Sequence, residues 1–383
     1  MTRELLISSY LLFIRFWFVI FSIKPLKNKT VLIASFGDNI DHVRKSCLTH
    51  TEHDLIILTT NSSRISFEES PREKVLRFET IHIVEFIKSI YHVATSKVIF
   101  VDNYFGFLAA ATFKPEVKVV QLWHAAGAIK RFGLEDPTIK KRSRRANKRF
   151  KQVYQRFTHV VVGSEKMTTI FKQAFDLKEK QILRTGIPRT DFFFNDKDMR
   201  ASKKSVINKY SSIKNKKVIL YAPTFRDSEI ADFQLQIDVS ALKKAFGSSH
   251  KLLLRLHPVV RSKKNYNNDD FIIDVSDYPN INELLLVTDY LISDYSSIPF
   301  EFSLLNRPML FFSYDLDSYL RERGVWEDYH TLVPGPVFSS TEKIISIIEA
   351  NKFNHEKLAY FKEDWNTYSK GTSSSDLVNY IYN

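Results

Sequence analysis

The polar residues best suited to chemistry come directly after apolar, β-branched runs of strand length. The first group lies in QLWHAAGAIKRFG, where Trp123 and His124 end such a run and Gly127, Lys130 and Arg131 follow. A histidine can act as a general base because its unperturbed pKa lies near neutrality, and small residues allow close backbone approach. A histidine at a strand end can also be structural, and this segment alone leaves both interpretations open.

A second group ends the run KLLLRLH, which contains Arg255 and His257. The forked guanidinium and an imidazole N–H are suitable donors to a phosphate oxygen. The alternative is an ordinary strand end with a capped histidine.

A third group, ISDYSS, contains Asp294, Ser296 and Ser297 and leads into a predicted helix. Hydroxyls and exposed N–H groups at a helix N-terminus make an anion site. A serine there also serves as an ordinary N-cap, and both interpretations can hold together. The segment YAPTFRD adds Thr224 and Arg226 at another strand end, either as cleft residues or as turn chemistry.

Several kinds of site are excluded by patterns that the sequence lacks. It contains no G-x-x-x-x-G-K-[ST] or G-x-G-x-x-G phosphate loop, which argues against an ordinary nucleotidase or dehydrogenase. A single cysteine, Cys47, excludes a disulfide framework and a Cys-rich metal site, and no H-E-x-x-H motif suggests zinc. We therefore expect neither a metal nor a cofactor, and Asp294 is expected to be structural.

The charge of the chain calls for an anionic partner. The formal net charge is +13, and the densest positive stretch is KKRSRRANKRFK, at residues 140–151. Nucleic acid is one such partner, but no nucleic-acid module is recognisable. The stretch could be a solvated helix face; because the N-terminus is apolar, we prefer contact with lipid phosphates, through Lys141, Arg144 and Arg145.

The N-terminal stretch from Leu5 to Ile23 is almost entirely apolar. It is marginally long enough to span a bilayer, but Arg15 would then lie near the centre, at a cost of about 2.5–3.5 kcal/mol. The small residues of a signal-peptide cleavage site are missing.

A helix lying in the membrane interface explains this stretch better. Ser8, Arg15 and Ser22 fall on one helical stripe, and Lys24 follows the helix, where it could meet anionic lipid. Apolar and aromatic bulk that could enter the head-group boundary comes from Phe13, Phe16, Trp17, Phe18 and Phe21. The remaining alternative is a first helix that is buried in the domain.

Short apolar runs alternate with helix-length segments along the rest of the chain. Two such series, 29–164 and 217–315, are separated by a polar stretch at 195–217, which we interpret as a linker. Near-continuous apolar strands alternating with helices indicate parallel sheets covered on both faces. The sequence therefore predicts an α/β fold with two doubly wound domains facing a cleft: residues 29–205 and 206–383, after a membrane helix at 1–28. The last helical stretch is expected to pack back across both.

The ordered set of motifs resembles a known family. WHAAGAIKRFG, TGIPRTD, YAPTFRD, RLHP, ISDYSS, NRPMLFFSYDLDSY and PGP occur in the order found in the CDP-glycerol glycerophosphotransferases of teichoic acid synthesis. The resemblance covers residues 121–336. It implies a GT-B-type fold of two Rossmann-like domains, peripheral association with the cytoplasmic face of the cell membrane, and transfer of glycerol phosphate from CDP-glycerol with release of CMP.

The same resemblance assigns roles to residues. The two functional histidines of the family correspond to His124, the expected general base, and His257, expected at the donor phosphates. The donor-binding serine pair corresponds to Ser296 and Ser297. Arg255, Thr224 and Arg226 are further donor-site candidates, and Trp123, Gly127, Lys130, Arg131 and Asp294 are acceptor or cleft candidates.

The first motif also suggests which reaction of the family is carried out. Chain-extending members read WHGTPLKK, whereas WHAAGAIKRFG is similar to the priming members. Those add the first sn-glycerol 3-phosphate to N-acetylmannosaminyl-N-acetylglucosaminyl-diphospho-undecaprenol. Chain extension with glycerol or ribitol phosphate is the nearer alternative, and a non-catalytic membrane module of the wall-synthesis complex is the distant one.

Overall fold

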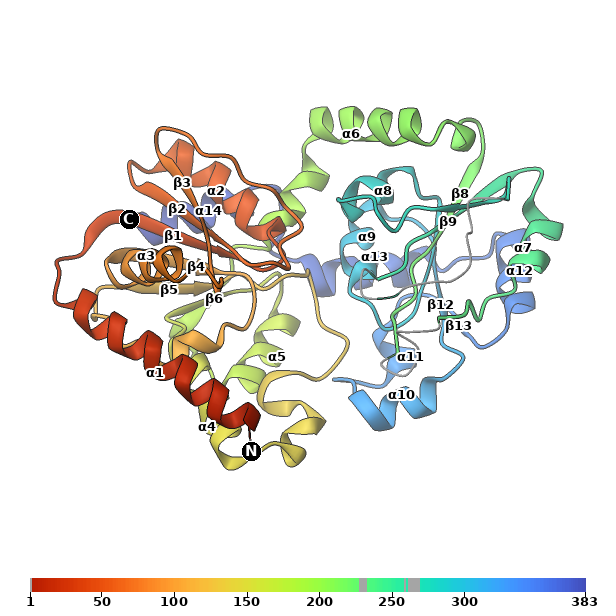
Figure 1. Cartoon of the computed structure of the whole chain (residues 1–383). Coiled ribbons are helices and arrows are strands. Elements are labelled where there is room, and N and C mark those ends of the chain that lie inside the picture. The colour runs from red at the N-terminus through yellow and green to blue at the C-terminus, as the bar shows by residue number, and fades with distance from the viewer. Residues whose placement is uncertain (1, 227–232, 258–259, 261–268) are drawn as a thin grey trace. The chain divides into compact units, whose positions relative to one another are not determined.

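The computed structural model describes residues 2–226, 233–257, 260 and 269–383 of the chain (Figure 1). It divides into two compact units, which we describe separately. Unit 1 comprises 1–124, 132–191 and 367–383, and unit 2 comprises 125–131 and 192–366. The division at 191/192 differs from the predicted boundary at 205/206, and the first motif changes units immediately after His124.

Unit 1 is built on a seven-stranded parallel sheet of order β3-β2-β1-β4-β5-β6-β7. Its central strands are buried because their runs are apolar; Val31, Leu32 and Ile33 are each 0% exposed. The strands are β1 (Lys27–Ala34), β2 (Asp54–Thr59), β3 (Glu73–Arg77), β4 (Ser96–Val101), β5 (Lys118–Gln121), β6 (His159–Val161) and β7 (Ile182–Leu183).

Unit 2 is built on a six-stranded parallel sheet of order β10-β9-β8-β11-β12-β13. The strands are β8 (Lys217–Tyr221), β9 (His250–Leu254), β10 (Ile272–Asp274), β11 (Tyr290–Ser293), β12 (Met309–Phe312) and β13 (Val337–Phe338). In both sheets the first strand is central and the order reverses between the first and fourth strands. Ligands of such sheets bind beyond the carboxyl ends of the strands at this switch point.

The predicted α/β class with parallel sheets is confirmed, and every apolar run predicted as a strand is one. Three strands were missed. β3 (EKVLR) carries charges, and β7 and β13 have two residues each, too few for a recognisable pattern.

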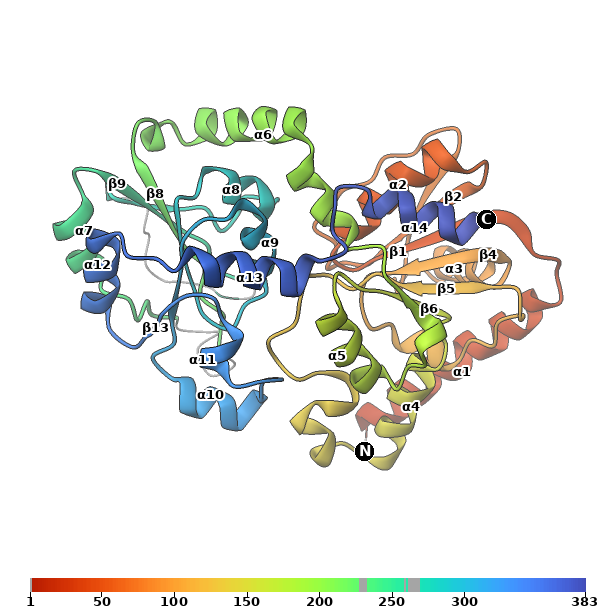
Figure 2. The ribbon, with the colours of Figure 1, turned by 180° about the vertical axis from the view of Figure 1, so that it is seen from behind.

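The helices of unit 1 include the apolar N-terminal helix and the C-terminal one. They are α1 (Thr2–Ser22), α2 (Asp38–His50), α3 (Ile83–Ala94), α4 (Arg144–Tyr154), α5 (Glu165–Phe175) and α14 (Ser373–Tyr382). Although α14 comes from the end of the chain, it packs against α2 (Figure 2). The Asp191 carboxylate accepts hydrogen bonds from the N–H groups of Ser373 and Ser374 and so caps α14.

The helices of unit 2 correct one prediction. The polar stretch at 195–217, predicted to be a linker, contains α6 (Asp196–Lys209), capped by the Asn195 side chain. Its low apolar content concealed a helix that buries only Val206. The other helices are α7 (Val239–Phe246), α8 (Ile281–Val287), α9 (Ile298–Phe302), α10 (Leu316–Arg323), α11 (Tyr329–Leu332), α12 (Thr341–Ala350) and α13 (His355–Asn366).

Candidate functional site

The switch point of unit 1 is held together by Asp102, which follows β4. This fully buried carboxylate accepts hydrogen bonds from the N–H groups of Ser35 (2.9 Å), Phe36 (2.9 Å) and Gly37 (2.8 Å), in the loop after β1. Burial raises the pKa of Asp102 to about 6, although the three N–H groups oppose this. The loop that leads into α2 is thereby fixed to the end of β4.

His124 lies three residues beyond β5, next to this switch point. Its ring stacks with Phe36, at a centroid distance of 4.4 Å, and with Trp123, at 4.2 Å. Its Nδ1 is 3.3 Å from the carbonyl oxygen of Asp102. That acceptor selects the tautomer with the proton on Nδ1, which leaves the Nε2 lone pair available to take a proton.

The electrostatic surroundings keep this imidazole neutral. Burial is the main cause that lowers the pKa of His124 to about 4, and the charges of Arg189 and Arg64 lower it further. The hydrogen bond to Asp102 acts in the opposite direction. At neutral pH, His124 is therefore an unprotonated group that can act as a base.

The backbone beside His124 is held in a strained conformation. Trp123 has φ +61°, a left-handed value that costs a non-glycine residue about 1–3 kcal/mol. Two buried side chains hold it there: the Gln121 amide oxygen accepts from the Trp123 N–H (2.8 Å), and the Asn39 amide donates to its carbonyl (2.8 Å). Such strain persists where surrounding contacts over-determine a conformation, and it directs the His124 ring.

Arg189 supports the same segment from another loop, η5 (Pro188–Phe194). Its Nη1 donates to the His124 carbonyl at 3.1 Å and lies 3.7 Å from an Asp38 carboxylate oxygen. Its backbone N–H donates to the Asn39 amide oxygen. Two sequence motifs, WH and TGIPRTD, thus meet around His124.

The switch point of unit 2 is organised around Asp294, which follows β11. This buried carboxylate accepts hydrogen bonds from the N–H and hydroxyl of Thr224, in the loop after β8, and from Arg226 at 3.2 Å. Burial raises the pKa of Asp294, and Arg226 opposes this. Asp294 therefore joins the loops after β8 and β11.

The guanidinium of Arg226 already binds carboxylates of the protein. Its Nε and Nη2 donate to the two oxygens of Asp315, at 2.7 and 2.9 Å. Its guanidinium also lies 5.1 Å from the ring centroids of Tyr295 and Tyr319. Burial opposes ionisation, but the bonds to Asp315 hold the pKa of Arg226 above its ordinary value. This arginine joins the loops after β8, β11 and β12.

The RLHP segment places its two candidates differently. Arg255 is 9% exposed, and its Nη1 donates to the backbone carbonyls of Val275 and Tyr278. His257 is exposed, with its ring 4.6 Å from that of Phe225. The histidine is thus accessible at the end of β9, whereas the arginine fixes the neighbouring loop.

The serine pair lies between β11 and the short helix α9. The Ser296 hydroxyl is 2.9 Å from that of Ser293, and both Ser296 and Ser297 are partly exposed. Ser297 is the N-cap residue of α9 but makes no side-chain cap bond. Its hydroxyl is therefore not engaged in capping.

Residues 125–131 of the first motif belong to unit 2. Gly127 lies against Phe300, because a Cβ there would be 2.5–2.7 Å from three ring carbons. Lys130 Nζ is 5.5 Å from the Tyr319 ring centroid, and Arg131 is bound through its Nε to the Val325 carbonyl. The structure therefore brings Lys130 close to the Arg226–Asp294 cluster.

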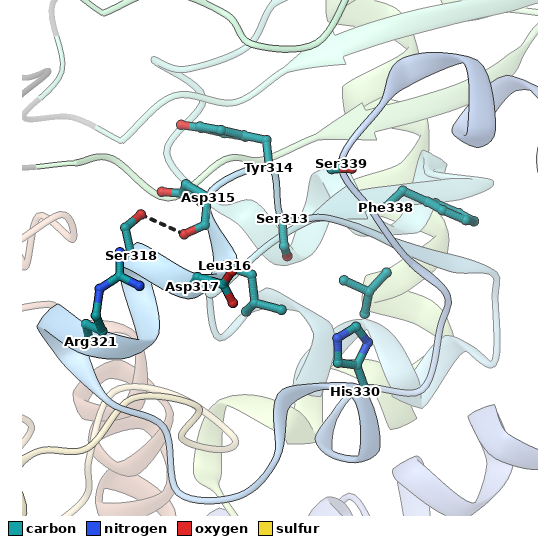
Figure 3. A pocket seen from close by; sticks show the side chains of 11 residues that line it. Ser313, Tyr314, Asp315, Leu316, Asp317, Ser318, Arg321, His330, Phe338 and Ser339 are labelled. Atoms are coloured by element: carbon teal, nitrogen blue, oxygen red, sulfur yellow. Dashed lines mark hydrogen bonds between the residues drawn. The ribbon is translucent and has the colours of Figure 1, made fainter.

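A cavity of about 500 Å³ opens beyond the ends of β12 and β13 (Figure 3). Asp315 and Arg321 lie on one side of it and His330 on another, and Phe338 supplies an apolar wall. Its size is that of a small-molecule site, which typically measures about 300–1,000 Å³. The motif NRPMLFFSYDLDSY contains the lining residues 313–318, but sequence reasoning did not predict the cavity, because Arg321, His330 and 337–339 complete it from other segments.

The predicted membrane residues divide between two faces of α1. The helix is long and apolar enough to cross a membrane, but it packs along α3 (Figure 1). Arg15 and Phe16 are exposed, and Trp17 is half-buried. Phe18, predicted to enter the head-group boundary, is instead 2% exposed and packs against Phe113. The prediction was wrong for Phe18 because it did not assign α1 a face that packs against the rest of unit 1.

The basic stretch forms α4 and the turn before it. Lys141, Arg144 and Arg145 are exposed. Arg149, on the same helix, forms a bidentate pair with Glu4 of α1 at 2.7 and 3.0 Å. The exposed cations of α4 therefore lie beside the N-terminal end of α1.

Sequence reasoning missed the residues that position His124. Four buried polar side chains do so: Asp102 and Gln121, in or directly after apolar runs, and Asn39 and Arg189, in polar loop and helix-start segments. A polar side chain in a buried run is the signal that could have found the first two, because burial requires a hydrogen-bond partner. Among the described residues, no group of three or more His, Cys, Asp or Glu side chains could hold a metal ion.

The chain is similar to known proteins along its whole length. The teichoic acid glycerol-phosphate primase of Bacillus subtilis (strain 168) is 37% identical over 388 residues, covering 100% of this chain and 98% of that protein. The primase of the same name from Staphylococcus aureus (strain NCTC 8325 / PS 47) is 30% identical, covering 93% and 91%.

Solved structures share the fold. The wall teichoic acid polymerase TagF has a TM-score of 0.80 at 22% identity, covering 100% of this chain and 98% of that one. The S. aureus MnaA–UDP complex has a TM-score of 0.57 at 14% identity, covering 92% and 96%. A family model described as CDP-Glycerol:Poly(glycerophosphate) glycerophosphotransferase matches residues 16–383, and the chain belongs to that family of transferases.

Proposed function

We propose that the protein is a teichoic acid glycerol-phosphate primase. It transfers sn-glycerol 3-phosphate from CDP-glycerol to N-acetylmannosaminyl-N-acetylglucosaminyl-diphospho-undecaprenol and releases CMP. The observation that carries this proposal is the 37% identity to the B. subtilis primase over 100% of this chain. Units 1 and 2 then act as the acceptor and donor domains of a GT-B-type enzyme.

In the proposed reaction His124 is the general base. Its Nε2 takes the proton of the acceptor sugar hydroxyl, whose oxygen attacks the glycerol-bearing phosphorus of CDP-glycerol. The bond from that phosphorus to the bridging oxygen breaks, and CMP leaves with the bond's electron pair. The neutral imidazole and its fixed Nδ1 support this role. Phosphoryl transfer depends mainly on positioning and electrostatics, so no covalent intermediate is needed.

Two kinds of residue serve the donor in unit 2. His257, Ser296 and Ser297 are accessible side chains at strand ends, and we assign them to the diphosphate. Arg255 and Arg226 position the loops that carry them, since both guanidiniums already bind protein acceptors. We do not need a cofactor or a metal in this scheme.

The nucleoside end of the donor is assigned to the cavity beyond β12 and β13. The Asp317 carboxylate can accept hydrogen bonds from ribose hydroxyls, and Phe338 offers an apolar wall to the base. The cavity and the Ser296–Ser297 segment lie at neighbouring strand ends, because β11 pairs with β12.

Ribitol-phosphate transfer is the second candidate. The ribitol-phosphate primase of Bacillus spizizenii (strain ATCC 23059 / NRRL B-14472 / W23) is 31% identical over 93% of this chain. That likeness spans nearly the whole chain, so the donor must be tested directly.

The decisive experiment is CMP release from CDP-glycerol, with and without the disaccharide-diphospholipid, and in parallel from CDP-ribitol. Acceptor-dependent release that stops after one addition supports the primase. Repeated additions, or activity only on a primed acceptor, identify a chain-extending enzyme. The absence of release with both donors identifies a non-catalytic module. His124→Ala should lower turnover by about 10²–10⁴-fold.

The proposed location is the cytoplasmic face of the cell membrane, with α1 lying in the plane of the surface. One face of α1 is packed on unit 1 through Ile14 and Phe18, while Leu12 (63%) and Phe16 (60%) are exposed. Leu12→Ser with Phe16→Ser should weaken vesicle binding, whereas Tyr360→Ser, at an exposed site of unit 2, should not. Unchanged binding of the double variant would reject this anchor.

A further inference from the structure

Three lysines converge on one aromatic ring where α1 meets β1. The Nζ atoms of Lys24, Lys27 and Lys29 lie 5.5, 5.6 and 4.6 Å from the ring centroid of Tyr91, on α3. A fourth lysine, Lys114, donates to the Lys24 carbonyl at 2.8 Å. We call these four lysines and Tyr91 the lysine cluster.

The positive charges of the lysine cluster repel one another. Lys29 is 4% exposed; its Nζ donates to Thr95 and lies 3.2 Å from His92 Nδ1. Burial lowers the pKa of Lys29 to about 8, and the charge of Lys27 lowers it further. Burial also lowers the pKa of His92 to about 3, with Lys29 the next cause. Positive charge is therefore concentrated where part of it is shielded from water.

Among the described residues, no carboxylate neutralises this charge by direct contact. In the part of the chain that the structure describes, none of the four lysines forms an ion pair. The charge of Asp54 raises the pKa of Lys29, but this effect is smaller than those of burial and of Lys27. An external anion would relieve the repulsion and would receive several charge-assisted hydrogen bonds.

The cluster continues the exposed apolar face of α1. Val19 (57%) and Ile23 (82%) are exposed in the last turns of the helix and just beyond it. Phe21, in the last turn, contacts the Tyr91 ring edge-on at 5.4 Å. This combination of apolar side chains and converging ammonium groups is suited to bind a molecule that carries both acyl chains and a phosphate.

We propose that the lysine cluster binds the phosphate of an anionic phospholipid head group and so fixes the C-terminal end of α1 at the membrane surface. This inference rests on the proposed membrane association of α1. It adds a defined site, with Tyr91 as the platform on which the ammonium groups are arranged.

The position of the cluster favours a bulk phospholipid over the diphosphate of the acceptor. Lys27 begins β1, whereas the loop that packs on His124 follows its end. Eight residues of strand at about 3.3 Å each separate the two ends of β1 by roughly 26 Å. That distance exceeds the length of a disaccharide, so an acceptor whose sugar reaches His124 does not bring its diphosphate here.

The test is binding of the full-length protein to vesicles of phosphatidylcholine with and without phosphatidylglycerol. Lys24→Gln with Lys27→Gln should weaken binding to anionic vesicles by roughly 30-fold, because each basic residue near such a surface contributes about 1 kcal/mol. Lys178→Gln with Lys180→Gln, at exposed sites of unit 1, is the matched control for charge and should change binding much less. Tyr91→Leu keeps every charge and should still weaken binding several-fold.

If both lysine pairs weakened vesicle binding equally, the effect would come from net charge alone and the proposed site would be overturned. Unchanged binding of the variant with Lys24→Gln and Lys27→Gln would also overturn it. Two further arms identify the source of the phosphate. Inorganic phosphate alone, followed by the ring signals of Tyr91, should bind far more weakly than the vesicles. On neutral vesicles that carry the acceptor diphospholipid, which the active site binds, the variant with Lys24→Gln and Lys27→Gln should lose much less binding than it loses on phosphatidylglycerol vesicles. Tight binding of inorganic phosphate, or an equal loss on acceptor vesicles, overturns the phospholipid assignment. Since no donor is present, these results do not depend on catalysis.

Discussion

The Nδ1 atom of His124 lies 3.3 Å from the backbone carbonyl oxygen of Asp102, while the Asp102 carboxylate holds three N–H groups of the loop after β1. One residue thus fixes both the tautomer of the candidate base and the loop whose Phe36 stacks on it. The base is positioned by backbone geometry at the switch point of the sheet and needs no charged partner at Nδ1.

We expect His124 to titrate far below the ordinary histidine range. Its pKa of about 4 means that the imidazole stays neutral as pH falls from 7 to 5, so kcat/KM should not fall through loss of the base in this range. NMR titration of the His124 ring, assigned by comparison with His124→Asn, measures this directly. A midpoint near 6.5 would contradict the burial argument.

The same shift has a consequence for stability. The folded pKa is below the unfolded value of about 6.5, so the unfolded state binds more protons between pH 6.5 and 4. This group's contribution to stability is therefore full above pH 6.5 and is lost as pH falls through that window. Activity in acid must accordingly be compared with a circular-dichroism melt at the same pH.

Gln121 should prove to be a positioning residue. Its amide donates to the Asn103 carbonyl at 3.0 Å and accepts from the Trp123 N–H at 2.8 Å. Gln121→Leu leaves both backbone groups unpaired and releases the strained Trp123, so we expect kcat to fall by about 10²-fold. The KM for CDP-glycerol should stay near its original value, because the proposed donor site is in unit 2.

The exposed residue Gln173 provides the control, since Gln173→Leu should leave both constants unchanged. A rise in KM for CDP-glycerol with unchanged kcat would show that Gln121 does not act through the base.

The elements of the fold could be predicted where their burial requires a recognisable hydrophobic pattern in the sequence. Runs such as TVLIA and KVIFV are buried on both faces of a parallel sheet, and they were recognisable for that reason. α6 was not, because it buries a single side chain, and β13 was too short to show any period. The hydrophobic pattern of a sequence reflects burial, so it does not reveal elements that bury few side chains.

The candidate site shows the same division. His124 and the serine pair could be predicted because they follow apolar runs, where ligands of doubly wound sheets bind. The roles of the arginines depend on partners distant in sequence: Arg226 reaches Asp315 across 89 positions, which no spacing rule anticipates. Asp102 and Asp294 each follow the fourth strand of their sheet and bind the loop after the first, a correspondence visible only once the strand order is known.

Gly127 should tolerate no side chain. A Cβ there would lie 2.5 Å from Phe300 Cγ, a buried ring atom that cannot turn away. Gly127→Ala should therefore destabilise unit 2 by about 1–3 kcal/mol, through overpacking, and displace the segment that carries Lys130. Thermal unfolding, together with CMP release at a temperature where the variant is folded, measures both effects.

Gly106 is the matched glycine, because the nearest atom to its added Cβ is 3.9 Å away. Gly106→Ala should leave the melting temperature nearly unchanged. Equal melting temperatures for the two variants would show that Phe300 moves to make room.

Arg226 and Asp315 should act as one unit in holding the donor site. Arg226→Lys loses the bidentate pair, and Asp315→Asn removes the charge that compensates the guanidinium. Each single change should raise the KM for CDP-glycerol, since the loops after β8, β11 and β12 share this junction. The double change should cost less than the sum of the two, with a coupling energy of about 0.5–3 kcal/mol in a double-mutant cycle on kcat/KM. Additive effects would mean that the two residues act independently and that their pairing does not shape the site.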